Sequence, residues 1–173
     1  MPQEILKMQK TTPYFIFTLL FFSLIGYSQA PKKTLQTLFC NEKINIDGKL
    51  TEAIWKNAEI ATDFVMINPD NGKAELKERR TEVKVVYDND AIYIGATLFD
   101  NEPSKIRKEL TQRDNDASAD MFGVFINGYN DGQQEARFAV SAAGVQIDGM
   151  YTSTSEQDLS WNAIWDSHVE ITN

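Results

Sequence analysis

The sequence predicts an all-β domain, an antiparallel jelly-roll-like β-sandwich that carries one short helix. Three observations support this fold class. Short runs of alternating apolar and polar residues recur along the chain, separated by turns rich in Asp, Asn and Gly. Only residues 51–58 combine helical spacing with a helix start signal. Residues 31–173 show no internal repeat and have a length suited to one domain with one core.

The domain is expected to open with a strand, a tight turn and the short helix. The strand is predicted at Lys43–Asp47, and Asp47-Gly48 supplies a turn that tolerates positive φ. Thr51 occupies the position of an N-cap, whose side chain accepts a backbone N–H of the first helical turn. Trp55 lies on the apolar face of the helix predicted at Thr51–Ala58, and we therefore expect it in the core.

The clearest β region is a hairpin in the middle of the chain. Glu82–Tyr87 alternates polar and apolar residues, Asp88-Asn89-Asp90 turns the chain, and Ala91–Phe99 returns. Further strands are predicted at Ala61–Ile67, Met121–Asn127, Glu135–Ala142, Val145–Tyr151 and Ser167–Thr172. Such short strands at regular spacing are typical of a sandwich of two packed sheets.

The N-terminus has the order of a secretory signal peptide. Lys7 and Lys10 precede an uncharged apolar run at Tyr14–Tyr27, and the small residues Ser28-Gln29-Ala30 follow it. The run is shorter than the roughly 20 apolar residues that span a bilayer. A retained N-terminal membrane anchor is the alternative interpretation.

This order predicts three segments along the chain. They are a signal peptide at 1–30, a lead-in segment at 31–42 and the sandwich domain at 43–173. The mature chain is therefore expected in the periplasm, at the outer membrane or outside the cell. Its domain is not expected to insert directly into a membrane.

The composition excludes several classes of function. A formal net charge of −8 argues against nucleic acid and anionic membrane as partners, and is compatible with neutral sugars and divalent cations. The single cysteine, Cys40, cannot form an internal disulfide and is expected to be a small buried residue. With one histidine, His168, the chain lacks the ligands of a His/Cys zinc site. No catalytic residue is predicted.

Five aspartates in loops are candidate ligands for a structural Ca²⁺ ion: Asp88, Asp90, Asp100, Asp114 and Asp116. Calcium takes several carboxylate and carbonyl oxygens, which irregular loop sites can supply. Two alternatives remain open. An Asp in a turn accepts backbone N–H groups without any metal, and paired carboxylates can act as general acid and base in glycoside hydrolysis.

Two tryptophans near the C-terminus are candidates for sugar stacking. Trp161 and Trp165 are four residues apart, so they share one face of a helix but diverge in an extended loop. One of them is expected in the core. Trp161 follows the polar stretch 153–160 and is the better candidate for an exposed ring that stacks on a sugar.

Three segments together resemble the family 9 carbohydrate-binding module, a calcium-containing jelly-roll-like sandwich: Ile46–Trp55, Tyr87–Gly95 and Asp120–Ile126. The resemblance extends from Lys43 to the end of the chain. It implies non-catalytic binding of a polysaccharide or oligosaccharide and a structural Ca²⁺ ion.

The resemblance also implies two sugar-binding positions. Arg137 matches an arginine that contacts the sugar, and Asp120 matches the acid that opens the preceding strand. Alternatively, these two residues pair with each other across neighbouring strands. Sugar-binding members of the family also place a tryptophan where this chain has Asn115–Ala119, a stretch without an aromatic residue.

Two further runs are similar to one subgroup, the large exported proteins of Gram-negative bacteria: Phe122–Gly132 and Ala142–Asp148. In that subgroup the module precedes a long region that resembles an outer-membrane barrel. The family also continues beyond the position of Asn173. The resemblance therefore implies a longer gene product with a downstream domain, and a sandwich truncated at its C-terminus.

Three functions follow as expectations. The first is an exported carbohydrate-binding module that targets an attached enzyme or outer-membrane protein to polysaccharide in carbohydrate catabolism. The second is a structural or interaction domain that docks on an outer-membrane barrel or another partner without binding sugar. The third is the N-terminal piece of a glycoside hydrolase whose catalytic domain lies downstream.

Overall fold

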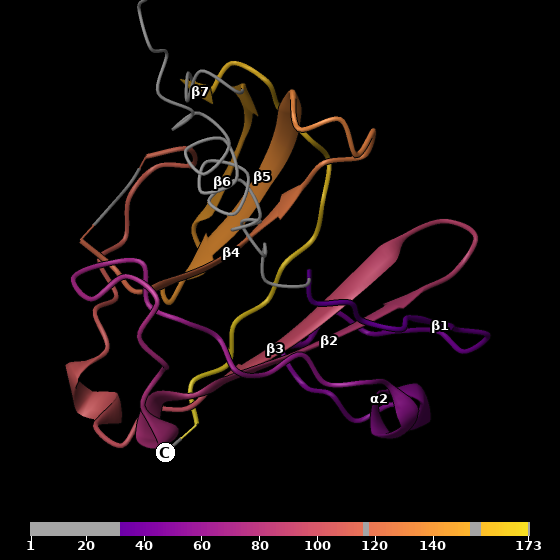
Figure 1. The fold of residues 1–173 in the computed structure, drawn as a ribbon, viewed down its shortest axis with the longest axis horizontal. Coiled ribbons are helices and arrows are strands. Elements are labelled where there is room, and N and C mark those ends of the chain that lie inside the picture. The colour runs from indigo at the N-terminus through magenta and orange to yellow at the C-terminus, as the bar shows by residue number, and fades with distance from the viewer. Residues whose placement is uncertain (1–31, 116–117, 153–156, 173) are drawn as a thin grey trace, which may run out of the picture. The chain divides into compact units, whose positions relative to one another are not determined.

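Two β-sheets hold most of the secondary structure (Figure 1), as expected for an all-β fold with one short helix. The structure, a computed structural model, describes residues 32–115, 118–152 and 157–172. The predicted signal peptide and Asp116 therefore lie outside the described residues. The chain divides into two units, Met1–Thr34 and Leu35–Asn173, and every element below belongs to the second.

The first sheet has the order β1-β2-β3 and the second has the order β4-β5-β6-β7. The first consists of β1 (Leu38–Phe39), β2 (Thr81–Tyr87) and β3 (Ile92–Leu98). The second consists of β4 (Met121–Ile126), β5 (Gln134–Ser141), β6 (Gln146–Thr152) and β7 (Gln157–Asp158). The remaining elements are α2 (Ala53–Asn57) and two 3-10 turns, η1 (Lys77–Arg79) and η2 (Pro103–Lys105). Among the described residues, no helix is long and apolar enough to cross a membrane.

The central hairpin is confirmed. β2 and β3 pair antiparallel from Thr81↔Leu98 to Tyr87↔Ile92. Asp88 closes its turn, because Oδ1 accepts the backbone N–H groups of Asp90 and Ala91, each at 2.8 Å. The other carboxylate oxygen accepts the Tyr93 hydroxyl at 2.8 Å. Turn chemistry therefore accounts for Asp88 without a metal.

The segment expected to be a lead-in carries strand β1. This strand pairs parallel with β2, with Leu38 opposite Val86, so the first sheet is not wholly antiparallel. The backbone N–H of Cys40 also donates to the carbonyl of Tyr87 at 2.7 Å. The sheet therefore begins before residue 43, inside the segment that was expected to be only a lead-in.

The short helix is confirmed, but the predicted N-cap is wrong. α2 begins at Ala53 with Glu52 at the cap position, and the Glu52 side chain makes no capping hydrogen bond. Its carboxylate instead accepts the backbone N–H of Asn45 and the indole N–H of Trp55. The N–H of Ile54 donates to Glu42 Oε1 at 2.8 Å, so a distant side chain takes the role expected of Thr51.

The main apolar core lies around α2 and the first sheet. Its buried members are Cys40, Ile44, Trp55, Ala58 and Val86. The predictions that Trp55 and Cys40 are core residues are therefore confirmed, with Trp55 only 3% exposed. Burial of the Trp55 ring in this cluster holds the helix on the sheet.

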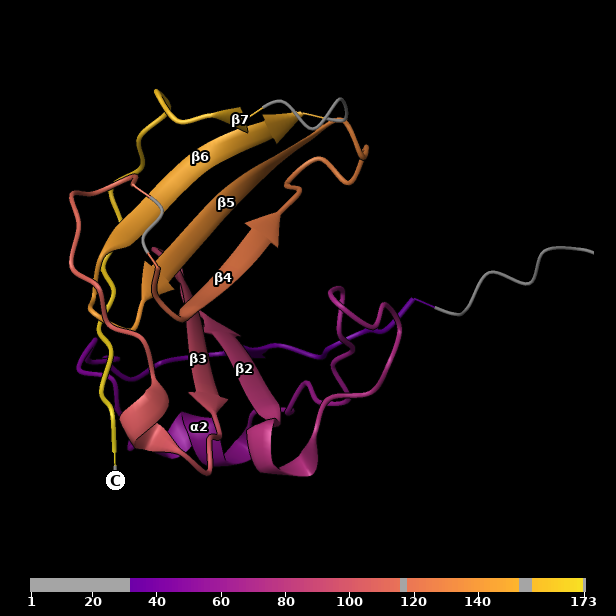
Figure 2. The ribbon, with the colours of Figure 1, turned by 90° about the vertical axis from the view of Figure 1, so that its left-hand side faces the viewer.

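Three strands of the second sheet follow the prediction closely. Figure 2 shows β4, β5 and β6 side by side, and all their pairings are antiparallel. Three consecutive residues of β6, Ile147-Asp148-Gly149, are buried. Because neighbouring side chains of a strand point to opposite faces, this run shows that both faces of β6 are covered.

Three other predicted strands are wrong. Residues 43–47 and 167–172 form no strand, and 61–67 contributes only the isolated bridges Ala61↔Val83 and Val65↔Ala74. Asp63 has a φ of 58°, which interrupts extended backbone inside the third of these segments. In the first, the N–H of Asn45 is taken by the Glu52 side chain. The C-terminal segment binds the sheet mainly through side chains, as described below.

Candidate functional site

The register of the second sheet decides which candidate residues can act together. Arg137 lies opposite Phe125 on β4 and Gly149 on β6, whereas Phe138 lies opposite Val124 and Asp148. Since side chains alternate along a strand, the Arg137 set and the Phe138 set occupy opposite faces of the sheet. The two faces are described in turn.

The first face carries a cluster that we call the aromatic–arginine face: Phe125, Glu135, Arg137 and Tyr151. Arg137 Nη1 donates to the Tyr151 hydroxyl at 3.1 Å. The rings of Phe125 and Tyr151 meet edge to face, with centroids 5.4 Å apart. Glu135 is the cross-strand partner of Tyr151 and is half-buried. Phe125 stays 53% exposed, so the cluster presents an aromatic surface to solvent.

Gly149 lies where the chain after β7 comes close to the sheet. Gly149 is the direct cross-strand neighbour of Arg137 and has no side chain. A Cβ at this position would lie 3.0 Å from the carbonyl oxygen of Asp158 and 3.2 Å from the Leu159 side chain. The chain after β7 therefore passes close to this point and flanks the aromatic–arginine face. A glycine is needed here for close approach of backbone.

Trp161 lies with the opposite face. Its ring meets Phe138 edge to face with centroids 5.9 Å apart, and Trp165 meets the same ring with centroids 5.5 Å apart. Both tryptophans are half-buried. The segment is extended, and a shared partner ring, not helical spacing, brings the two indoles together. The structure therefore does not place Trp161 beside Arg137.

Asp120 lies far from Arg137 along the sheet. It precedes β4, and its carbonyl accepts the N–H of Ala142, five residues beyond Arg137. At about 3.3 Å per residue this separation is roughly 17 Å of strand. The Asp120 carboxylate accepts the backbone N–H of Arg107 at 3.1 Å and lies 3.6 Å from its guanidinium. The register thus separates the two residues that the sequence analysis considered as a pair.

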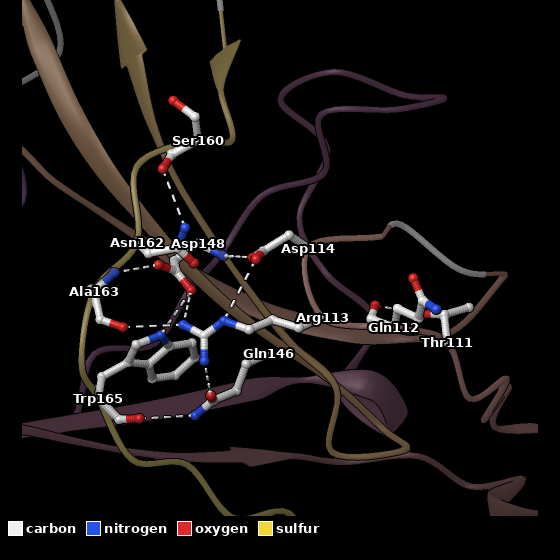
Figure 3. Close-up of polar contacts among 10 residues, drawn as sticks. All are labelled: Thr111, Gln112, Arg113, Asp114, Gln146, Asp148, Ser160, Asn162, Ala163 and Trp165. Atoms are coloured by element: carbon white, nitrogen blue, oxygen red, sulfur yellow. Dashed lines mark hydrogen bonds and ion pairs between the residues drawn. The ribbon is translucent and has the colours of Figure 1, made fainter.

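An ion pair between a half-exposed arginine and a buried aspartate lies on the Phe138 face, where loop 111–115, β6 and the C-terminal segment meet (Figure 3). Asp148 is fully buried, at 0% exposure. Its carboxylate accepts hydrogen bonds from the Arg113 guanidinium, from Ala163 N–H at 2.6 Å and from Trp165 Nε1 at 3.2 Å. Its own backbone N–H donates to Asp114 Oδ1 at 2.9 Å. A buried carboxylate with this many donors is fully satisfied.

The environment of Asp148 stabilises its ionised form. Burial alone would raise the pKa of its carboxyl, because desolvation disfavours the charge. The hydrogen bonds from Ala163, Trp165 and Arg113, together with the positive charge of Arg113, outweigh burial and hold the pKa below its usual value. The group is therefore a carboxylate throughout the neutral range.

Arg113 and Gln146 complete this network. Arg113 Nη1 donates to Gln146 Oε1 at 2.7 Å, and Nη2 donates to the Ala163 carbonyl at 3.1 Å. Gln146 Nε2 donates to the Trp165 carbonyl and to Ser167 Oγ, each at 3.0 Å. Sequence analysis did not identify the network, because an aspartate inside an alternating strand carries no sign that it is buried. The side chains come together from positions more than 30 residues apart.

The four candidate calcium ligands that the structure describes do not lie together in one site. Asp88 and Asp90 lie at one end of the β2–β3 hairpin and Asp100 follows its other end, about 20 Å away along a seven-residue strand. Asp100 Oδ1 accepts the N–H of Glu102 at 2.6 Å, and Asp114 takes part in the network above. Among the described residues, no three His, Cys, Asp or Glu side chains are placed to hold a metal ion.

Comparison with known proteins identifies the family of the chain. No curated protein and no solved structure shows a significant match. A family model described as carbohydrate family 9 binding domain-like matches residues 46–171, which is most of the chain. The match begins at the turn that precedes α2 and covers β2 to β7 and the C-terminal segment, whereas β1 precedes it. The chain therefore belongs to the carbohydrate family 9 binding domain-like family.

Proposed function

We propose that this domain binds carbohydrate without transforming it, and that the aromatic–arginine face is the binding surface. Family membership supports the ligand class. We choose this surface because Arg137 contacts Tyr151 beside the exposed ring of Phe125. On the other face, Trp161 packs on Phe138 and lies away from this group.

The chemistry of this face suits a sugar. A pyranose presents a C–H face that packs on an aromatic ring and a rim of hydroxyls that need donors and acceptors. Phe125 offers the ring, Arg137 offers N–H donors, and Glu135 offers carboxylate oxygens. All three belong to neighbouring positions of adjacent strands, and a rigid sheet therefore positions them.

The binding surface would serve to bring a polysaccharide to another protein or domain. We infer an exported module that holds a polysaccharide close to an attached enzyme or outer-membrane protein. The predicted signal order at residues 1–30 supports export, and the acidic charge is compatible with a neutral polysaccharide. A structural Ca²⁺ ion stays a prediction, and the four described aspartates among its candidate ligands lie apart from one another.

The test is binding of the full chain to a panel of soluble polysaccharides by affinity electrophoresis, followed by calorimetry on any that bind. Arg137→Ala and Phe125→Ala should each weaken binding at least tenfold, which corresponds to about 1.4 kcal/mol. Tyr129→Ala removes another exposed aromatic ring, outside the strands of the sheet, and should bind like the unchanged chain. Equal binding by all variants would contradict the proposed surface.

One observation favours a second function. Residues 115–119, where sugar-binding members of the family are expected to place a tryptophan, carry no aromatic residue. An interaction domain that docks on a partner protein without binding sugar fits this departure. If the folded chain binds no carbohydrate in the panel, this second function replaces the first.

A further inference from the structure

The C-terminal segment contacts the second sheet in an unusual way. Residues 161–167, which we call the strap, are extended but form no strand. Their alternate residues Trp161, Ala163, Trp165 and Ser167 are half-buried, and the residues between them are exposed. This is the pattern of a strand that covers a surface, yet a backbone ladder does not hold it.

Side chains take the place of the ladder. The Ala163 N–H donates to the Asp148 carboxylate, and the Ala163 carbonyl accepts from Arg113. The Trp165 carbonyl accepts from Gln146. Three backbone groups of the strap are thus bonded by three side chains, two from β6 and one from loop 111–115. A ladder distributes its backbone hydrogen bonds over many residues, whereas the strap's backbone is bound by only these three side chains.

The negative charge of Asp148 is the centre of this attachment. One oxygen accepts from both Arg113 and Trp165, and the other accepts from Ala163. Loss of the charge would leave donors without a strong acceptor in a fully buried position. Arg113 would lose its closest carboxylate and would keep its hydrogen bonds to Gln146 Oε1 and the Ala163 carbonyl, and its contact with Asp114 from Nε to Oδ2 at 3.5 Å. Neutralisation of this carboxylate therefore weakens the hydrogen bonds from Ala163, Trp165 and Arg113 together, whereas the bonds from Gln146 to the strap remain.

Three elements present groups to Asp148. Loop 111–115 presents Arg113 and Asp114, and β5 presents Phe138 across the strands. The strap presents Ala163 and Trp165, which do not titrate. Asp158 of β7 is exposed and bonded to Ser160.

The residues that follow the strap lie beside the turn that precedes α2. A Cβ at Gly48 would lie 2.9 Å from His168 and 3.1 Å from Glu170, just beyond the strap. Lys49 Nζ lies 3.7 Å from Glu170 Oε1. The segment that begins as the strap therefore continues beside the turn that precedes α2. Release of the strap would uncover Phe138 on the second sheet and loosen this connection.

We propose that the strap can detach from the second sheet while the rest of the domain stays folded. The ion pair between Asp148 and Arg113 holds the strap on the Phe138 face. Opening leaves β4–β6 and the first sheet intact. It exposes Phe138, Trp161 and Trp165 as an apolar aromatic surface on the face opposite the aromatic–arginine face. Neutralisation of Asp148 opens the strap.

Hydrogen exchange followed by mass spectrometry on the full chain tests this directly at pH 7. In Asp148→Asn and in Arg113→Gln, peptides that cover 161–167 should exchange at least tenfold faster than in the unchanged chain. Peptides from the β2–β3 hairpin should keep their rates. Asp70→Asn is the matched control, because it removes a carboxylate from an exposed pair with Lys73 far along the sequence.

Two results would overturn the proposal. One is unchanged exchange of 161–167 in both variants. The other is equal acceleration of 161–167 and of the β2–β3 hairpin, which would show that the strap opens only when the domain unfolds. If Asp148→Asn does not fold, Arg113→Gln still tests the proposal, since this side chain is 40% exposed. The unchanged chain in acid provides a second test: 161–167 should lose protection at a higher pH than the hairpin.

Discussion

The two sheets are held by different kinds of interaction. Around the first sheet, α2 buries Trp55 in an apolar cluster with Ile44, Ala58 and Val86. On the Phe138 face of the second sheet, the covering segment is fastened to a buried carboxylate, Asp148, by charge-assisted hydrogen bonds. Apolar burial is insensitive to pH and spread over a surface, whereas an ion pair depends on one proton and on geometry. The two regions should therefore respond differently to mutation and to acid.

The largest effect is expected in the apolar region. Trp55→Ala removes the ring that packs α2 on the sheet and leaves a cavity in the apolar cluster. We expect a loss of about 3–5 kcal/mol in the free energy of unfolding. Urea denaturation monitored by far-UV circular dichroism measures it. A loss below about 1 kcal/mol would show that the cluster is not the main core.

A smaller loss is expected when the ion pair is broken. Asp148→Asn keeps the shape of the side chain and removes its charge, so Arg113 loses its main partner. Because Arg113 can turn to water, we expect a loss of about 2–3 kcal/mol in the free energy of unfolding. The same urea experiment at pH 7 checks this value, with Asp70→Asn as the control that should change little.

Acid should reduce the stability contributed by the Asp148 ion pair and leave that of the apolar cluster unchanged. The native pKa of Asp148 is lowered, so its contribution to stability is complete above the ordinary aspartate pKa of about 4 and is lost as the pH falls through the native value. Asp88 and Glu52 near the first sheet also have lowered pKa values, but they are only half-buried and solvent screens them. Free energies of unfolding measured between pH 7 and pH 3 should fall less steeply in Asp148→Asn than in the unchanged chain. Parallel curves would contradict the assignment of this pH dependence to Asp148.

The smallest effect is expected at the helix start. Glu42→Ala removes the acceptor of the Ile54 N–H and should cost about 1 kcal/mol in the free energy of unfolding. Thr51→Ala, at the residue that the sequence suggested as the cap, should cost much less. Equal losses from the two variants would show that Glu42 does not act as the cap.

The apolar region could be predicted from sequence, and the polar region could not. Apolar residues recur with helical spacing around Trp55 and with alternate spacing in β2 and β5. Such local periodicity indicates which side of a helix or strand is apolar. Arg113 and Asp148 are 35 residues apart, and nothing in either neighbourhood shows that the two side chains meet. Predicted strands at 43–47 and 167–172 failed for the same reason. In the first, the Asn45 N–H binds the Glu52 side chain, and in the second, Ser167 is bound through its hydroxyl to Gln146.

The candidate binding face shows the same limit. Arg137 was identified from a resemblance, but its companions Phe125 and Tyr151 follow from strand register, which sequence does not reveal. Trp161 and Asp120 were plausible from sequence, and the register places one on the opposite face and the other far along the strand. Whether each residue contacts a sugar stays a prediction that binding experiments decide.

The most direct test of the account is a map of the binding surface by NMR. The backbone amides of the chain would be followed while a soluble oligosaccharide from the binding panel is added. The account predicts that shifts concentrate in β4, β5 and β6 around Phe125, Arg137 and Tyr151, and that they disappear in Arg137→Ala. Shifts concentrated at Asp120 or around Trp161, or no shifts with any oligosaccharide, would contradict a carbohydrate site on the aromatic–arginine face.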